Sequence, residues 1–104
     1  MANEALSKKF WECAKNFLEH NKTATFLEEM KSATLSQMMM KQGDIPVSKA
    51  EMQAKASPEW EEYLRLMTSS RAAANEAKLQ MEWIRMRSME RASEEATARL
   101  EMKL

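Results

Sequence analysis

The sequence contains one glycine, two prolines and one cysteine among its 104 residues. Tight turns between strands need positive φ angles, which glycine adopts most readily, so a single glycine is too few for a sheet. The lone Cys13 has no partner for an internal disulfide bond. We therefore expect an all-α protein whose fold does not depend on disulfide bonds.

Long apolar runs are also missing, as is an excess of charge of either sign. No stretch approaches the roughly 18 uninterrupted apolar residues of a membrane span, and the first residues do not resemble an export signal. Sixteen basic and sixteen acidic side chains balance, so the chain as a whole is not drawn to nucleic acid or to a membrane. We expect a single helical domain, cytoplasmic and without membrane association.

The second half of the sequence predicts one long helix over residues 58–103. Ser57 can cap the free backbone amides, and Pro58 loses nothing at the first helical position, where its missing N–H would be unpaired. From Glu59 onwards the chain has no glycine or proline and is rich in strong helix formers. Such a helix is roughly 70 Å long. Its weakest propensity lies at Thr68–Ser70, where we expect any bend.

Shorter helices are predicted before it. Apolar residues at spacings of four, three and four predict a helix over residues 4–19, with Leu6, Phe10, Cys13 and Phe17 on one face. The pair Thr25 and Glu28 has the spacing of a capping box and predicts a second helix over 26–42, ended by Gly43. A loop over 43–48 follows, and a second capping box, Ser48 with Glu51, predicts a short helix over 49–56. We expect two short N-terminal helices packed on the long one.

The lengths of these elements predict self-association. Each of the first two helices is about 25 Å long, so together they leave part of the 70 Å helix bare. Exposed apolar stripes of this extent mark interfaces, and we expect a homo-oligomer, preferably a dimer, in which long helices pair. The heptad pattern is too mixed to decide between parallel and antiparallel pairing. The predicted interface residues are Leu79, Met81, Trp83, Ile84, Met86, Met89, Ala92, Ala96 and Leu100.

Residue types that carry catalysis or bind metals do not gather in a recognisable pattern. Cys13 and His20 are two helical turns apart, but a metal site needs further ligands, and a core cysteine with a surface histidine is favoured. The pairs Glu28–Glu29, Glu61–Glu62 and Glu94–Glu95 are adjacent on helices, so their carboxylates diverge and are typical of a solvated surface. We expect no enzymatic activity, no metal, no cofactor and no small-molecule substrate.

Two clusters are candidates for binding. Lys78, Arg85, Arg87 and Arg91 lie near Trp83, and arginine with tryptophan can contact phosphates and stack on bases. Glu82 and Glu90 dilute this charge, and salt bridges on a solvated helix are the favoured interpretation. The run Met38, Met39 and Met40 could contact a partner, since methionine adapts to irregular apolar surfaces, or could fill the core of the bundle.

Three segments carry a resemblance to known proteins: Ser57-Pro58-Glu59-Trp60-Glu61-Glu62-Tyr63-Leu64, Ala74-Asn75-Glu76-Ala77-Lys78, and Trp83 through Met102. This C-terminal half resembles small helical proteins of tailed bacteriophages that are encoded beside genes for homologous recombination and single-strand annealing. The resemblance implies a phage or prophage accessory factor in the cytoplasm of a bacterial host. Its expected role is DNA recombination or replication through protein contacts, with DNA as a candidate ligand. The alternative is an inhibitor or adaptor that binds a host enzyme, such as a nuclease, without touching DNA.

Overall fold

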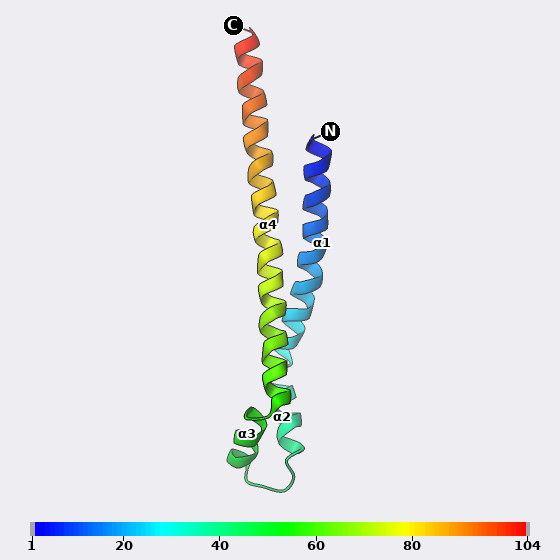
Figure 1. Ribbon diagram of the computed structural model, residues 1–104, viewed down its shortest axis with the longest axis vertical. Helices are drawn as coiled ribbons and strands as arrows, with labels where there is room; N and C mark the ends of the chain where they lie inside the picture. Colours follow the sequence, from blue (N-terminus) through cyan, green and yellow to red (C-terminus); the bar gives the residue numbers. More distant parts are fainter. Residues whose placement is uncertain (1, 104) are drawn as a thin grey trace.

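The computed structural model describes residues 2–103, with side chains from Ala5 onwards, and forms a narrow rod of 84 × 19 × 18 Å. Its helices are α1 (Ala2–Glu29), α2 (Lys31–Met40), α3 (Val47–Lys55) and α4 (Pro58–Lys103). α1 and α4 lie side by side and run antiparallel, and α4 extends well past the start of α1 (Figure 1). The described residues contain no strand. The all-α class and the long C-terminal helix packed on the N-terminal part are thereby confirmed.

α4 begins where the sequence predicts. The Ser57 hydroxyl accepts a hydrogen bond from the Trp60 amide at 3.3 Å and donates one to the Ala54 carbonyl at 2.6 Å. The side chain therefore caps α4 and also ties it to the end of α3. The helix continues without interruption through Thr68–Ser70. Ser70 is buried there, and the hydroxyl of Ser69 donates to the Leu66 carbonyl.

α1 is longer than the sequence predicts. We expected a helix over 4–19 and a new one from residue 26, but the chain stays helical to Glu29, and α2 spans only Lys31–Met40. Residues 20–25 contain no glycine or proline to stop the helix, and the Thr23 hydroxyl bonds to the Glu19 carbonyl within it. Thr25 and Glu28, which we interpreted as a capping box, instead contact α4.

The real boundary between the first two helices is Met30, a single turn residue at φ −85° and ψ 0°. Beyond it, α2 packs mainly against α3 at the base of the rod rather than along α4 (Figure 1). Gly43 has a φ of +88°, so it turns the chain between them as predicted. α3 starts at Val47 after Pro46, and no side-chain hydrogen bond caps it, so the second capping box is not formed either.

The two long helices meet along a seam of small side chains. Ala24 of α1 and Ala74 of α4 are both 0% exposed, and Ser70 and Ala77 are also buried. Small residues at the contact allow the axes of α1 and α4 to approach closely. Larger side chains close the two ends of this seam, with Trp60 buried near the base and Ile84 buried towards the far end.

α1 also reaches further along α4 than two short helices could. Leu6 lies beside Arg91 and Glu94, and Leu6 and Phe10 line a shallow hollow with Ile84. From Ala92 to Lys103, by contrast, every residue of α4 is exposed. Arg91 is thus the last residue of α4 that is partly buried, and the terminal segment is exposed.

Candidate functional site

The candidate site is a row of residues on the face of α4 that points away from α1. Seam positions Ala77, Met81 and Ile84 face α1, and the residues two places further on lie about 200° around the helix. These are Leu79, Trp83 and Met86, which are 66%, 59% and 59% exposed. The same spacing continues towards the C-terminus. The outer row is Leu79, Trp83, Met86, Glu90, Ser93, Thr97 and Leu100.

The structure divides the interface residues predicted from the sequence into two groups. Ile84 is only 6% exposed and Met81 is half-buried, so both belong to the chain's own contact between α1 and α4. The expectation that Ile84 is exposed in the single chain is therefore wrong, because α1 is long enough to cover it. The remaining members are exposed: Leu79, Trp83, Met86, Met89, Ala92, Ala96 and Leu100.

The basic residues near Trp83 do not form one surface. Arg87 lies with its guanidinium carbon 5.9 Å from the centre of the Trp83 ring and forms an ion pair of 3.5 Å with Glu90. Arg91 is half-buried and lines a hollow with Glu90 and Glu94. Lys78 and Arg85 are seven residues apart and share one flank of α4, whereas Arg87, two residues after Arg85, lies on the other. Positive charge is thus spread around the helix and mixed with glutamates.

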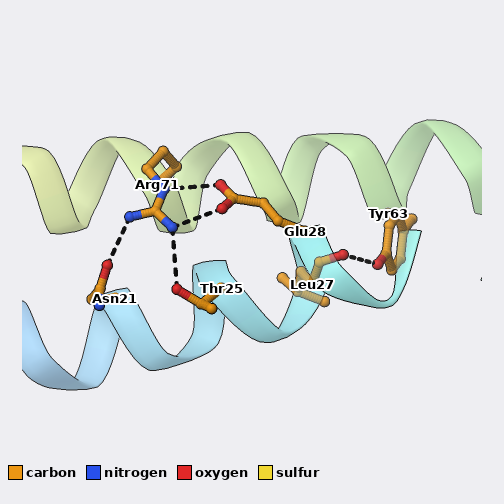
Figure 2. A network of polar contacts seen from close by, with 6 residues as sticks. All are labelled: Asn21, Thr25, Leu27, Glu28, Tyr63 and Arg71. Carbon is orange, nitrogen blue, oxygen red and sulfur yellow. Dashed lines mark hydrogen bonds and ion pairs between the residues drawn. The ribbon is translucent and has the colours of Figure 1, made fainter. Parts of the chain in front are cut away.

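A polar cluster centred on Arg71 joins the two long helices (Figure 2). Its Nε and Nη2 donate to the two carboxylate oxygens of Glu28, both at 2.8 Å, and Nη1 donates to Asn21 Oδ1 at 2.8 Å. Nη2 also donates to the Thr25 hydroxyl at 3.3 Å. The hydrogen bonds from Arg71 hold the pKa of Glu28 below its ordinary value, and those to Glu28 raise the pKa of Arg71. Sequence reasoning missed this cluster.

A second polar contact lies where α1 ends. The hydroxyl of Tyr63 donates a hydrogen bond to the Leu27 carbonyl (Figure 2). Carbonyls in the last turn of a helix lack an intrahelical partner, so this bond satisfies one of them. The Tyr63 ring also stacks on Trp60, with centroids 5.6 Å apart. Both polar contacts fix the register of α1 on α4 and thereby fix which face of α4 remains outside.

The other residues singled out in the sequence occupy ordinary positions. Cys13 is half-buried against α4, with its thiol 3.6 Å from Gln80 Oε1, and His20 is exposed. Glu61 forms a 2.7 Å ion pair with Arg65 on the helix surface. In the methionine run, Met38 and Met39 are half-buried within the α2–α3 tip and Met40 is exposed.

Within residues 2–103, no three histidine, cysteine, aspartate or glutamate side chains gather as metal ligands do. No helix of this part combines the length and the apolar character needed to cross a membrane. Comparisons with protein-family models, with curated proteins and with solved structures find no match to this chain.

Proposed function

We propose that this chain is a non-enzymatic accessory protein that acts through helix-mediated protein contacts. The observation that carries this proposal is the outer row, with large apolar side chains exposed on the face of α4 that α1 leaves free. Three such side chains, Leu79, Trp83 and Met86, follow one another within two helical turns. An apolar stripe on a helix, bordered by charged residues, is a surface suited to another helix.

The extended shape supports the same conclusion. The chain exposes 8370 Å² of surface, whereas a compact monomer of 12.1 kDa would expose about 6,000 Å². A two-helix rod has no second face on which to bury its remaining apolar side chains. Contact with another protein removes this surface from water, and we therefore include homo-oligomer formation in the proposal.

The proposed setting is DNA recombination or replication in a phage or prophage, acting in the cytoplasm of a bacterial host. This part rests on the resemblance of residues 57–102 to small phage proteins encoded beside recombination genes. The second candidate function is an inhibitor or adaptor that binds a host enzyme and does not touch DNA. The mixed charge around Arg87 and Arg91 favours protein over DNA as the ligand of distal α4, since a DNA-binding face would gather its cations on one side.

One pair of experiments tests this proposal. In a gel-shift titration with single-stranded and duplex DNA at about 50 and about 200 mM salt, we expect no shift at micromolar protein. A shift that weakens steeply with salt and disappears in an Arg85→Ala/Arg87→Ala variant would replace protein contact by DNA binding as the function.

In the second experiment, the chain is added to strand-annealing and exonuclease reactions carried out by phage recombination proteins, and to a reaction of a host nuclease. We expect a changed rate in the phage reactions that is lost in Trp83→Ala/Met86→Ala. A matched control, Glu62→Ala, lies on exposed α4 outside the outer row and should keep the effect. An effect confined to the host nuclease would favour the second candidate instead.

A further inference from the structure

We propose that the outer row is occupied by a second copy of this chain, docked antiparallel, so that the two α4 helices overlap from Gln80 to Lys103. This inference rests on the proposed function, because it names a partner for the same surface. It is carried by three observations: the exposed end of α4 fits the uncovered part of the row, the row repeats every seven residues, and the charges along its edges complement themselves in this orientation.

The first observation concerns length. α1 partly covers one face of α4 up to Arg91, and residues 92–103 are all exposed, with only Glu94 lining a hollow beside Leu6 of α1. If the two-fold axis passes between Arg91 and Ala92, the bare segment of each copy lies along residues 80–91 of the other. Both α1 helices then lie on the outer sides of the pair, because each packs on the face of α4 opposite the outer row. They do not obstruct the contact.

The second observation concerns the layers between the helices. The outer row repeats every seven residues, as a helix pair requires: Leu79, Met86, Ser93 and Leu100 form one set and Trp83, Glu90 and Thr97 the other. About the axis given above, Trp83 meets Leu100 of the second copy and Met86 meets Thr97. Glu90 meets Ser93, whose hydroxyl can donate to the carboxylate. Each of these contacts occurs twice by symmetry.

Charges at the edges of the row support this register. Arg87 borders the row on one side and faces Glu94 of the second copy, and Glu82 borders it on the other side and faces Lys103. All four residues are exposed in the single chain, and Arg87 would exchange its 3.5 Å ion pair with Glu90 for one with Glu94 of the second copy. Opposite charges flank these layers on both edges, which is how paired helices select orientation and register.

Two other arrangements fit less well. A parallel pair in register would oppose Glu90 to Glu90 within the contact, where two carboxylates repel. An antiparallel pair shifted by seven residues would oppose Arg87 to Arg87 at the edge and place Met86 against Glu90. Like charges at such positions disfavour a pairing.

Mass and cross-linking test the proposal. We expect sedimentation equilibrium at about 100 µM to give twice the chain mass of 12.1 kDa. In a Cys13→Ser background, chains carrying Met86→Cys are mixed with chains of different tag length carrying Thr97→Cys and are oxidised gently. We expect the disulfide-linked product to join unlike chains. As a control, Ser69→Cys lies on the same face of α4 but outside the overlap, and should not cross-link to Thr97→Cys.

A charge exchange tests the register. Arg87→Glu should raise the dissociation constant of the dimer about tenfold, and adding Glu94→Arg in the same chain should restore it to within about threefold of the original value. The matched variant Arg87→Glu/Glu82→Arg should not restore it, because residue 82 faces Lys103 of the second copy. In a parallel pair, residues 82 and 87 would be neighbours and this variant would be the one that recovers.

The outcomes separate this inference from the proposed function. A monomer mass at every concentration would overturn the second copy as the occupant and, with it, the homo-oligomer included in the proposed function. Contact of the outer row with a different protein would still be tested by the rate measurements above. Disulfides between like chains would overturn the antiparallel orientation. So would a dissociation constant restored in Arg87→Glu/Glu82→Arg but not in Arg87→Glu/Glu94→Arg. A dimer of expected mass that joins unlike chains and recovers with Glu94→Arg would establish it.

Discussion

The guanidinium of Arg71 on α4 binds both carboxylate oxygens of Glu28 on α1 at 2.8 Å and so forms a bidentate ion pair between the two long helices (Figure 2). Two parallel hydrogen bonds fix orientation as well as distance. Asn21 and Thr25 accept hydrogen bonds from the same guanidinium, so one side chain of α4 binds residues from two successive turns of α1. The small alanine and serine side chains of the seam do not by themselves fix the register of α1 on α4. The polar cluster around Arg71 fixes it.

This pair predicts a dependence of stability on pH. The native pKa of Glu28 lies below its ordinary value, so the folded state favours the carboxylate and gains stability above the unfolded pKa of about 4.3. That contribution is lost as the pH falls through the native pKa. Glu28→Gln should therefore melt at a lower temperature than the original chain at pH 7, and the difference should shrink towards pH 3. Thermal unfolding followed by circular dichroism measures both.

The neighbouring Glu29→Gln is the matched control for this experiment, since Glu29 is exposed at the next position of α1. Its melting temperature should follow that of the original chain at both pH values. Equal behaviour of the two variants would show that the contact with Arg71 does not stabilise the hairpin. Because both partners are partly exposed, added salt should also reduce the effect of Glu28→Gln.

The same cluster explains where sequence reasoning succeeded and where it failed. α4 was predictable because local signals agree: a serine and a proline start it and strong helix formers continue it. The end of α1 was not predictable from local signals. Thr25 and Glu28 have the spacing of a capping box, but in the structure both side chains bind Arg71, which is distant in the sequence. The spacing of Asn21, Thr25 and Glu28 is four and three. On a continuous helix these residues lie on one face, and that polar stripe is the signal from which the cluster could have been predicted. Of the candidate site, Leu79, Trp83 and Met86 were identified correctly as exposed, whereas the burial of Ile84 depended on the length of α1.

The small seam predicts a strong response to added volume. Ala74 is fully buried where α1 and α4 approach closely, so Ala74→Leu should force the helices apart and cost about 1–3 kcal/mol of unfolding free energy. Ala72 lies two residues away on the exposed side of the same helix, and Ala72→Leu should change stability by less than about 0.5 kcal/mol. Urea unfolding of both variants measures the difference. Similar losses in the two would contradict close packing at the seam.

The two serines that sequence analysis assigned as caps should respond differently. Ser57→Ala removes the hydroxyl that accepts from Trp60 and donates to Ala54, and should cost about 1 kcal/mol. Ser48→Ala should be nearly neutral, because α3 has no side-chain cap in the structure. Urea unfolding monitored by tryptophan fluorescence measures both, since Trp60 is buried beside the first of these sites. A comparable loss from Ser48→Ala would show that the second capping box does form.

Adjacent residues on α4 should separate folding from association. Ile84 packs under α1, so Ile84→Ala should lower the unfolding free energy of a single chain by about 2 kcal/mol, at the lower end of the range for buried isoleucine because only one helix covers it. Trp83→Ala, one residue earlier, should leave that free energy within about 0.5 kcal/mol when unfolding is measured at concentrations too low for dimers. At high concentration the order should reverse, with Trp83→Ala losing self-association and Ile84→Ala retaining it as long as it is folded. A loss of stability from Trp83→Ala at low concentration would place that ring within the chain's own core, and the outer face of α4 would then lose its central apolar residue.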